Sequence, residues 1–222
     1  MKKSLILSLI ALFGASVSGA EPSRADFVTY VESCEAILQE FQSIPTREAW
    51  QRAKGVLILN QFKAGVVLGV KDGYGVVMVK KPEGGWSLPV IVNAGEASLG
   101  LQLGGSKIES VFIITDEKTT RMLYKNQSMN IGADAKAVAG PRAAEKETFN
   151  EEILKSPMLA YTKSTGLYAG ATVKAGHISR YDKANFVLYD TTYTLPELLY
   201  SDWVKPVDEV RPIMALMRKI AP

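Results

Sequence analysis

The chain has 222 residues, of which 47% are hydrophobic, and it carries 26 lysines and arginines against 23 aspartates and glutamates. A chain of this size can bury one well-packed core or two small ones. Its charge is too close to neutral for the strongly basic domain that marks most nucleic-acid binding proteins, so any attraction to phosphate groups must come from a local cluster of charges.

Residues 1–20 have the pattern of a signal peptide. Lys2 and Lys3 form a positive start, an apolar run covers residues 5–13, and Ser18-Gly19-Ala20 provides the small residues that a signal peptidase recognises. The apolar run is shorter than the ~20 residues that span a bilayer; an uncleaved N-terminal anchor is the alternative interpretation. We expect removal of this signal peptide by cleavage after Ala20.

Export has consequences for the mature domain, residues 21–222. Loss of two lysines with the leader leaves 24 basic residues against 23 acidic ones, a formal charge of +1. Position 21 is glutamate rather than the cysteine that a lipoprotein needs, so we expect no lipid anchor and a periplasmic or secreted protein. The one cysteine, Cys34, cannot form an intrachain disulfide, and we expect it to be buried in a helix as a small hydrophobic residue.

An amphipathic helix is predicted directly after the leader. Ser23 and Asp26 have the spacing of a capping box. The acidic outer side of the helix disfavours a position on an anionic membrane, so we expect its apolar side to cover a sheet. The apolar residues at helical spacing are Phe27, Tyr30, Val31, Cys34, Ile37, Leu38 and Phe41.

Closely spaced β-prone runs follow a second, short predicted helix that Thr46 caps and Gly55 ends. Turn-like segments at 71–73 and 83–85 separate some of these runs. Links this short leave no room for helical crossovers, which favours an antiparallel sheet that curls or closes. The runs are 56–59, 65–70, 74–80, 86–92, 98–103 and 111–115.

The last third of the chain continues this mixed pattern without a linker. Asp116 is a predicted N-cap for a helix through Met122 and Leu123, and residues 140–157 are predicted to form a loop or a partly helical excursion. Strand-like runs then return, and a closing helix follows them. We therefore predict one α+β domain, dominated by a curled or barrel-like antiparallel sheet, with an N-terminal amphipathic helix and short flanking helices. The late runs are 159–162, 166–173 and 177–180, and the closing helix contains Ile213, Leu216, Met217 and Ile220.

A series of short motifs between Ala53 and Gly176 resembles the SYLF domain, a family that includes a yeast actin-patch protein and a human Src-homology-3 protein that binds phosphoinositides. No single motif is diagnostic, but eight occur in order and with sensible spacing. They are Ala53-Lys54-Gly55-Val56, Lys63-Ala64-Gly65, Gly73-Tyr74-Gly75-Val76, Trp86-Ser87-Leu88-Pro89, Ser98-Leu99-Gly100-Leu101-Gln102-Leu103-Gly104, Gly132-Ala133-Asp134, Ala139-Gly140-Pro141 and Lys163-Ser164-Thr165-Gly166-Leu167-Tyr168-Ala169-Gly170.

The resemblance implies binding of lipid or phosphoinositide headgroups and, for the yeast relatives, association with actin. Actin is not an expected partner of a protein with a bacterial-type leader. Two positions depart from the family pattern: Asp190 follows Tyr189 where the family often has glycine, and Asp72 replaces the basic residue common before the Gly-x-Gly turn. The resemblance therefore does not imply that the phosphate-binding surface of eukaryotic relatives is intact.

The sequence gives little support for catalysis, a cofactor or a metal. Gly65-x-x-x-Gly69 and Gly73-x-Gly75 lack the Gly-Lys-Ser/Thr ending of a phosphate loop, so turns and close strand contacts explain them better. His177 is the only histidine, and we expect it to be exposed or hydrogen-bonded rather than catalytic. One histidine and one cysteine exclude the usual zinc site. We expect no enzyme; an activity centred on His177 is the rival hypothesis.

The remaining hypothesis is a binding surface of basic residues beside an aromatic ring. Lys80 and Lys81 lead into the turn before Trp86, and tryptophan favours the interfacial zone of a bilayer. For Trp86, packing in the core is the favoured alternative because the residues after it continue a buried strand. Further candidate lipid-binding residues are Lys54, Lys63, Lys71 and Arg142.

We therefore predict an exported protein of the cell envelope that binds anionic headgroups or phospholipid at a membrane surface, peripherally and without catalysis. The alternative from another class is an envelope interaction or structural module that binds a protein partner and no lipid. Nucleic acid is not an expected partner.

Overall fold

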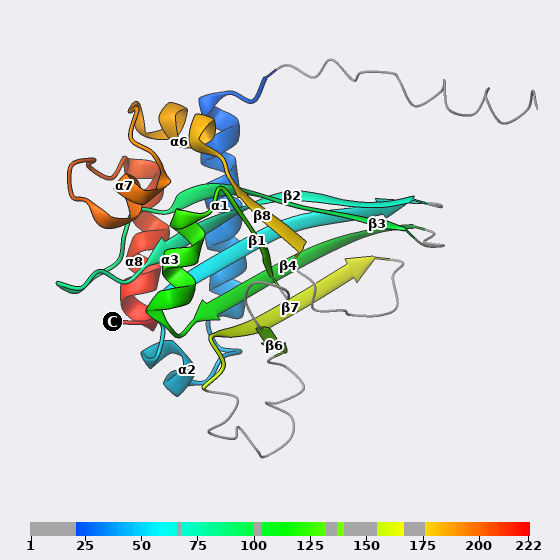
Figure 1. Cartoon of the computed structure of the whole chain (residues 1–222), viewed down its shortest axis with the longest axis horizontal. Helices are drawn as coiled ribbons and strands as arrows, with labels where there is room; N and C mark the ends of the chain where they lie inside the picture. The colour runs from blue at the N-terminus through cyan, green and yellow to red at the C-terminus, as the bar shows by residue number, and fades with distance from the viewer. Residues whose placement is uncertain (1–20, 66–67, 100–103, 132–136, 140–154, 167–175) are drawn as a thin grey trace, which may run out of the picture.

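Helices cover both faces of one end of a curled eight-stranded sheet, and the other end of the sheet extends away from them (Figure 1). The structure is a computed structural model that describes residues 21–65, 68–99, 104–131, 137–139, 155–166 and 176–222. The α+β fold with a dominant curled sheet confirms the fold class predicted from the sequence. The predicted leader, Arg142 and most of the predicted loop and strand at 140–157 and 166–173 lie outside the described residues.

The strand order in the sheet is β5-β8-β3-β2-β1-β4-β7-β6, and every neighbouring pair is antiparallel except β6 and β7. The hairpins β1–β2 and β3–β4 form its centre. The strands are β1 (Gly55–Gly65), β2 (Leu68–Val79), β3 (Val90–Leu99), β4 (Gly104–Ile114), β5 (Ser128–Ile131), β6 (Ala137–Ala139), β7 (Met158–Gly166) and β8 (Gly176–Arg180).

The six runs predicted between residues 56 and 115 are four longer strands. The predicted turn at 71–73 is wrong, because this segment lies inside β2 and pairs with residues 61–63 of β1. Before β3, Trp86 forms only an isolated bridge with Lys80. Glycine at 73 therefore does not mark a turn, and a close contact between strands explains it instead.

The helices divide between the two faces of the sheet. Helices α1, α6 and α8 pack together on one face, and α3 and α7 contact each other and the strands of the opposite face (Figure 1). The bounds are α1 (Arg24–Phe41), α2 (Arg47–Gln51), α3 (Glu117–Lys125), α6 (Asp182–Tyr189), α7 (Leu195–Tyr200), the 3-10 turn η2 (Asp208–Val210) and α8 (Arg211–Ile220).

The first half of β1 explains why helices are needed on both faces. Residues 56–59 are all fully buried, although their side chains point alternately to opposite faces. On one face, the Cys34 thiol of α1 lies 3.9 Å from the carbonyl oxygen of Ile58. On the other, a β-carbon at Gly55 would approach Thr120 of α3 to 2.9 Å. A continuous apolar run of this kind is typical of a strand covered on both sides.

Helix α1 has the predicted cap and the predicted core side. The Ser23 hydroxyl and the Asp26 carboxylate form the reciprocal capping box, and Cys34 is fully buried, as expected. Burial raises the pKa of the Cys34 thiol well above its usual range, so the thiol stays protonated and unreactive. The buried residues of the helix are Phe27, Val31, Cys34, Ile37, Leu38 and Phe41.

Helices α6 and α7 were not predicted from the sequence. The buried Asn185 side chain of α6 accepts a hydrogen bond from the Ile91 N–H at 2.8 Å and donates one to the Ile91 carbonyl at 2.9 Å. Strand β8 pairs with β3 only from residue 92 onward. The Asn185 amide therefore continues the backbone pairing of β3 where its neighbouring strand stops, which satisfies two buried polar groups.

Asp190 stands at the end of α6 in the left-handed region, with φ 49° and ψ 55°. Left-handed backbone favours glycine because glycine has no β-carbon. This geometry gives a physical reason for the aromatic-glycine pair that the SYLF family often has here. This chain uses aspartate, which tolerates the left-handed region better than most residues do.

We expect Asp190→Gly to raise the free energy of unfolding by about 0.5–1 kcal/mol, because it relieves this backbone strain. Urea denaturation of the two proteins measures the difference. Asp190→Ala is the control, since it removes the carboxylate and keeps the β-carbon. Equal stabilisation by alanine would show that the charge, and not the backbone, limits stability at this position.

Candidate functional site

Helix α3 presents a row of basic side chains to solvent. Asp116 caps the helix by accepting a hydrogen bond from Thr119 N at 2.8 Å, as its sequence pattern predicted. Thr119, Thr120 and Leu123 point inward and are buried. Lys118, Arg121 and Lys125 lie three and four residues apart and are exposed, so they share the outer face. We call these three residues the α3 cation face.

An open hollow of about 520 Å³ lies against this helix, lined by Glu117, Lys118, Arg121, Met122 and Lys125. Glu117 is the only acid in this lining, and its carboxylate lies 3.6 Å from the Arg121 guanidinium. Among the residues that the structure describes, Lys118 and Lys125 form no ion pair. The hollow therefore has a net positive lining that can attract an anion.

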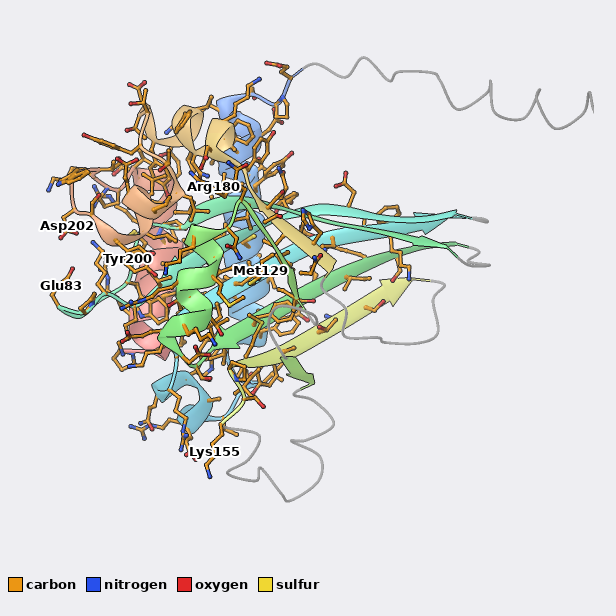
Figure 2. All side chains as sticks on the ribbon, in the orientation of Figure 1. Glu83, Met129, Lys155, Arg180, Tyr200 and Asp202 are labelled. Carbon is orange, nitrogen blue, oxygen red and sulfur yellow. The ribbon has the colours of Figure 1, made fainter. Side chains whose placement is uncertain are left out.

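Two further lysines belong to segments whose backbone contacts Ile114 and Thr115, the residues that lead into α3. The N–H of Lys54 donates to the Ile114 carbonyl at 2.7 Å, three residues before the helix begins. Lys155 directly precedes Ser156, whose carbonyl accepts a hydrogen bond from Thr115 (Figure 2). Both lysine side chains are exposed. Of the lysines proposed from the sequence, Lys54 thus has its backbone paired with the residue three positions before α3, and its carbonyl accepts a hydrogen bond from the Lys80 N–H at 2.8 Å.

Lys80, Lys81 and Trp86 are brought together, but their polar groups bind other parts of the protein. The Lys80 ammonium donates to the Pro222 carbonyl, and the Lys81 ammonium pairs with Asp202. Trp86 is 5% exposed and donates from Nε1 to the Ala221 carbonyl at 2.7 Å. The core interpretation of Trp86 is confirmed. Lys80 and Trp86 thus attach the end of the chain to the β2–β3 loop, and Lys81 attaches the loop that follows α7.

Lys63 and Lys71 lie at the opposite end of the sheet, where they pair across β1 and β2. Lys54 and Lys63 are nine residues apart along one extended strand, which is roughly 30 Å. The six described members of the predicted set therefore fall into two separate groups, and Arg142 lies outside the described residues. The assignment of Lys63 and Lys71 to lipid binding stays a prediction.

His177 is exposed, and its Nδ1 lies 3.3 Å from Asn130 Oδ1 on the neighbouring strand. An exposed or hydrogen-bonded role is what the sequence predicted for this histidine. In the described part of the chain, no three histidine, cysteine, aspartate or glutamate residues gather as metal ligands. Nor does any helix there have both the length and the hydropathy to cross a bilayer.

Sequence reasoning predicted the α3 helix but missed its outer face. The usable signal was the spacing of the basic residues, because positions 118, 121 and 125 repeat at the helical period. The sequence search instead followed lysines next to glycine turns and a tryptophan. Of those residues, Lys80, Lys81 and Trp86 lie around the β2–β3 loop, where the fold uses their polar groups for internal contacts.

Comparisons with known proteins find one matching family model and several relatives. The model described as Las17-binding protein actin regulator, Ysc84, matches residues 95–220. The chain is 29% identical over 173 residues to Protein YSC84 of Saccharomyces cerevisiae, covering 77% of this chain and 37% of that protein. It is 23% identical over 194 residues to human SH3 domain-containing YSC84-like protein 1, covering 83% and 57% respectively. The chain thus spans well under two thirds of these relatives' length.

Proposed function

The chain belongs to the Ysc84 family, whose domain is the SYLF domain, and on that premise we propose that it is an exported lipid-binding protein of the cell envelope. It associates peripherally with anionic headgroups and performs no catalysis. The observation that carries this proposal is the α3 cation face, which is exposed and borders an open hollow, and whose Lys118 and Lys125 form no salt bridge with any residue in the described part of the chain.

The binding free energy expected of the α3 cation face is small enough for reversible association with an anionic membrane. Each basic residue near an anionic membrane surface contributes on the order of 1 kcal/mol. Three such residues, with Glu117 opposing them, give about 2–3 kcal/mol, or roughly a 30- to 100-fold preference for anionic over neutral lipid. The mature chain has a formal charge near +1, so this preference has to come from the local cluster rather than from overall charge.

The test is vesicle flotation of the chain from Glu21 onward, which contains every described element. We expect co-flotation with phosphatidylcholine vesicles that contain phosphatidylglycerol, weaker co-flotation without it, and loss of the difference between ~0.05 and ~0.5 M salt because salt screens exposed charges. Absence of flotation at every salt concentration would contradict lipid binding. It would favour the alternative function, an envelope module that binds a protein partner.

Export is tested separately by expressing the full chain in bacteria. We expect the protein recovered from the periplasmic fraction to have the mass of a chain beginning at Glu21. Recovery of the uncleaved chain in the membrane fraction would instead support the N-terminal anchor.

A further inference from the structure

A second surface feature lies beside the helices of the α3 side. Trp203 is 67% exposed, although tryptophan is one of the largest hydrophobic residues. Its ring lies 5.5 Å from the ring of Tyr193 at an interplanar angle of 50°, and Tyr200 is also exposed. We call Tyr193, Tyr200 and Trp203 the aromatic patch. The other two tryptophans, Trp50 and Trp86, are buried.

Specific contacts hold the loop that carries Trp203. Ser201 N–H and its hydroxyl both donate to the Glu197 carbonyl, at 2.9 and 2.6 Å. The Lys81 ammonium donates to the Ser201 carbonyl at 3.2 Å and pairs with Asp202. Ser201 and Asp202, the two residues before Trp203, are therefore held against α7 and the end of β2. The folded structure itself keeps the Trp203 ring exposed.

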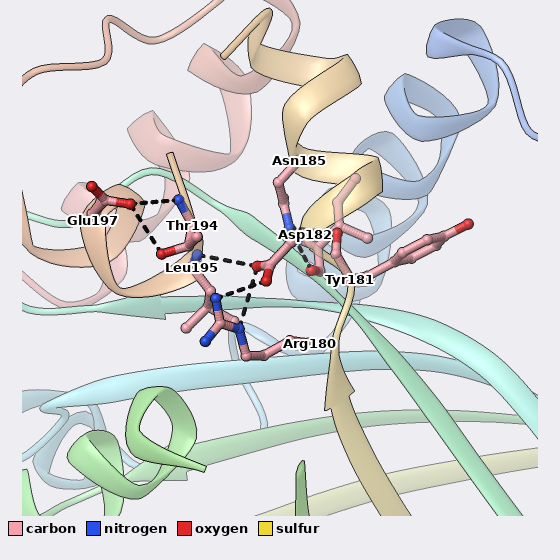
Figure 3. Close-up of polar contacts among 8 residues, drawn as sticks. Arg180, Tyr181, Asp182, Asn185, Thr194, Leu195 and Glu197 are labelled. Carbon is pink, nitrogen blue, oxygen red and sulfur yellow. Dashed lines mark hydrogen bonds and ion pairs between the residues drawn. The ribbon is translucent and has the colours of Figure 1, made fainter. Parts of the chain in front are cut away.

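The start of α7 is fixed as well. Glu197 accepts hydrogen bonds from the N–H and the hydroxyl of Thr194, at 2.7 and 3.0 Å. Asp182 accepts one from Leu195 N–H at 3.2 Å while it pairs with Arg180 at 2.7 Å (Figure 3). These contacts connect α7 to β8 and α6, so the aromatic patch has a defined position on the domain.

The patch is continuous with the α3 side of the protein and carries little local charge. Helix α7 contacts α3, and Leu123 and Leu195 line one small cavity between them. Next to Trp203 in the chain, Asp202 is paired with Lys81, and the charge of Lys205 also acts on its carboxylate. Glu83 lies on the same side of the view as Asp202 (Figure 2). Any attraction between this patch and a membrane is therefore apolar rather than electrostatic.

We propose that the aromatic patch, with Trp203 at its centre, inserts into the headgroup–acyl boundary of the bilayer to which the α3 cation face is drawn. This inference rests on the proposed lipid-binding function and names the surface that enters the membrane. Aromatic rings with a polar edge favour that boundary, because one part can leave water while the other keeps a hydrogen bond. Membrane binding then has two components, of which only the contribution of the cations is screened by salt.

Tryptophan fluorescence tests the insertion directly, because Trp203 is the exposed one of three tryptophans. With vesicles that contain phosphatidylglycerol, we expect a blue shift of the emission and quenching by brominated acyl chains. We expect Trp203→Phe to remove both signals and keep most of the binding. We expect Trp203→Ala to weaken partitioning by about 30-fold, at low and high salt alike, because on the order of 100 Å² of ring surface no longer leaves water.

Phe62→Ala is the matched control, since Phe62 is an exposed aromatic at the other end of the sheet. We expect it to leave partitioning unchanged. Flotation without a change in tryptophan emission would overturn the insertion and leave the lipid-binding function standing. Absence of flotation would overturn both. A Trp203 signal that appears without lipid, as protein concentration rises, would assign the patch to a protein contact and overturn the proposal.

Discussion

Replacement of Lys118, Arg121 and Lys125 by glutamine should weaken binding to anionic vesicles by about 30- to 100-fold at low salt. The three charges contribute on the order of 1 kcal/mol each at an anionic surface, less the opposing effect of Glu117. Glutamine is a good helix former, and all three side chains are exposed. We therefore expect the free energy of unfolding to change by less than about 1 kcal/mol. Vesicle partitioning and urea denaturation of the same protein measure both quantities.

The matched control replaces Lys183, Arg218 and Lys219 by glutamine. These residues are also exposed and lie on α6 and α8, away from α3. The control removes the same total charge, so it separates a local site from a general effect of net charge. We expect it to reduce vesicle binding by less than about threefold. Equal losses in the two triple variants would show that the α3 cation face has no special role.

The largest loss of stability is expected for Gly75→Ala. Strands β1 and β2 approach each other so closely that a β-carbon at Gly75 would lie 2.4 Å from the Ile58 carbonyl oxygen and 2.4 Å from Leu59 Cδ2. The carbonyl belongs to the fully buried first half of β1, between β2 and β4, and cannot move without disturbing both pairings. We expect a loss of about 3 kcal/mol in the free energy of unfolding.

Gly84→Ala is the comparison for this variant. A β-carbon at Gly84 meets nothing within 4 Å, but its φ of 95° is unfavourable for alanine. We expect a loss of about 1–2 kcal/mol, which reflects backbone strain alone. If Gly75→Ala destabilises the protein no more than Gly84→Ala does, close approach of β1 and β2 is not the reason for glycine in the Gly73-Tyr74-Gly75 motif.

Local patterns predicted the fold class because they agree with the packing in most of the chain. The capping box at Ser23 and Asp26 and the apolar spacing of α1 correspond to the structure in detail. The strand boundaries could not be predicted from the sequence, because glycine has two structural roles that give the same sequence pattern. At Gly84 it permits a positive φ in a turn, whereas at Gly73 and Gly75 it permits two strands to approach. Only the pairing of the strands separates these uses.

The candidate site was harder to predict because exposure depends on distant parts of the chain. Trp86 and Trp203 are both tryptophans next to charged loops. Trp86 is covered by the end of the chain, where Ala221 accepts its hydrogen bond, and Trp203 is not covered. Lys81 lies next to Lys80 and Pro82 in sequence, but its partner, Asp202, comes from the loop after α7. Such long-range contacts leave no periodic signal.

The central claim is that α3 faces an anionic membrane, and an environment-sensitive fluorophore on this helix tests it most directly. Cys34 is fully buried and its thiol pKa is raised, so a cysteine introduced at the surface can be labelled selectively. Glu117→Cys places the label beside the hollow and keeps all three cations. Ala215→Cys places it on the exposed side of α8, away from α3. We expect phosphatidylglycerol vesicles to blue-shift and brighten the label at 117, and to leave the label at 215 unchanged. A protein that floats with the vesicles while only the label at 215 responds would contradict this orientation.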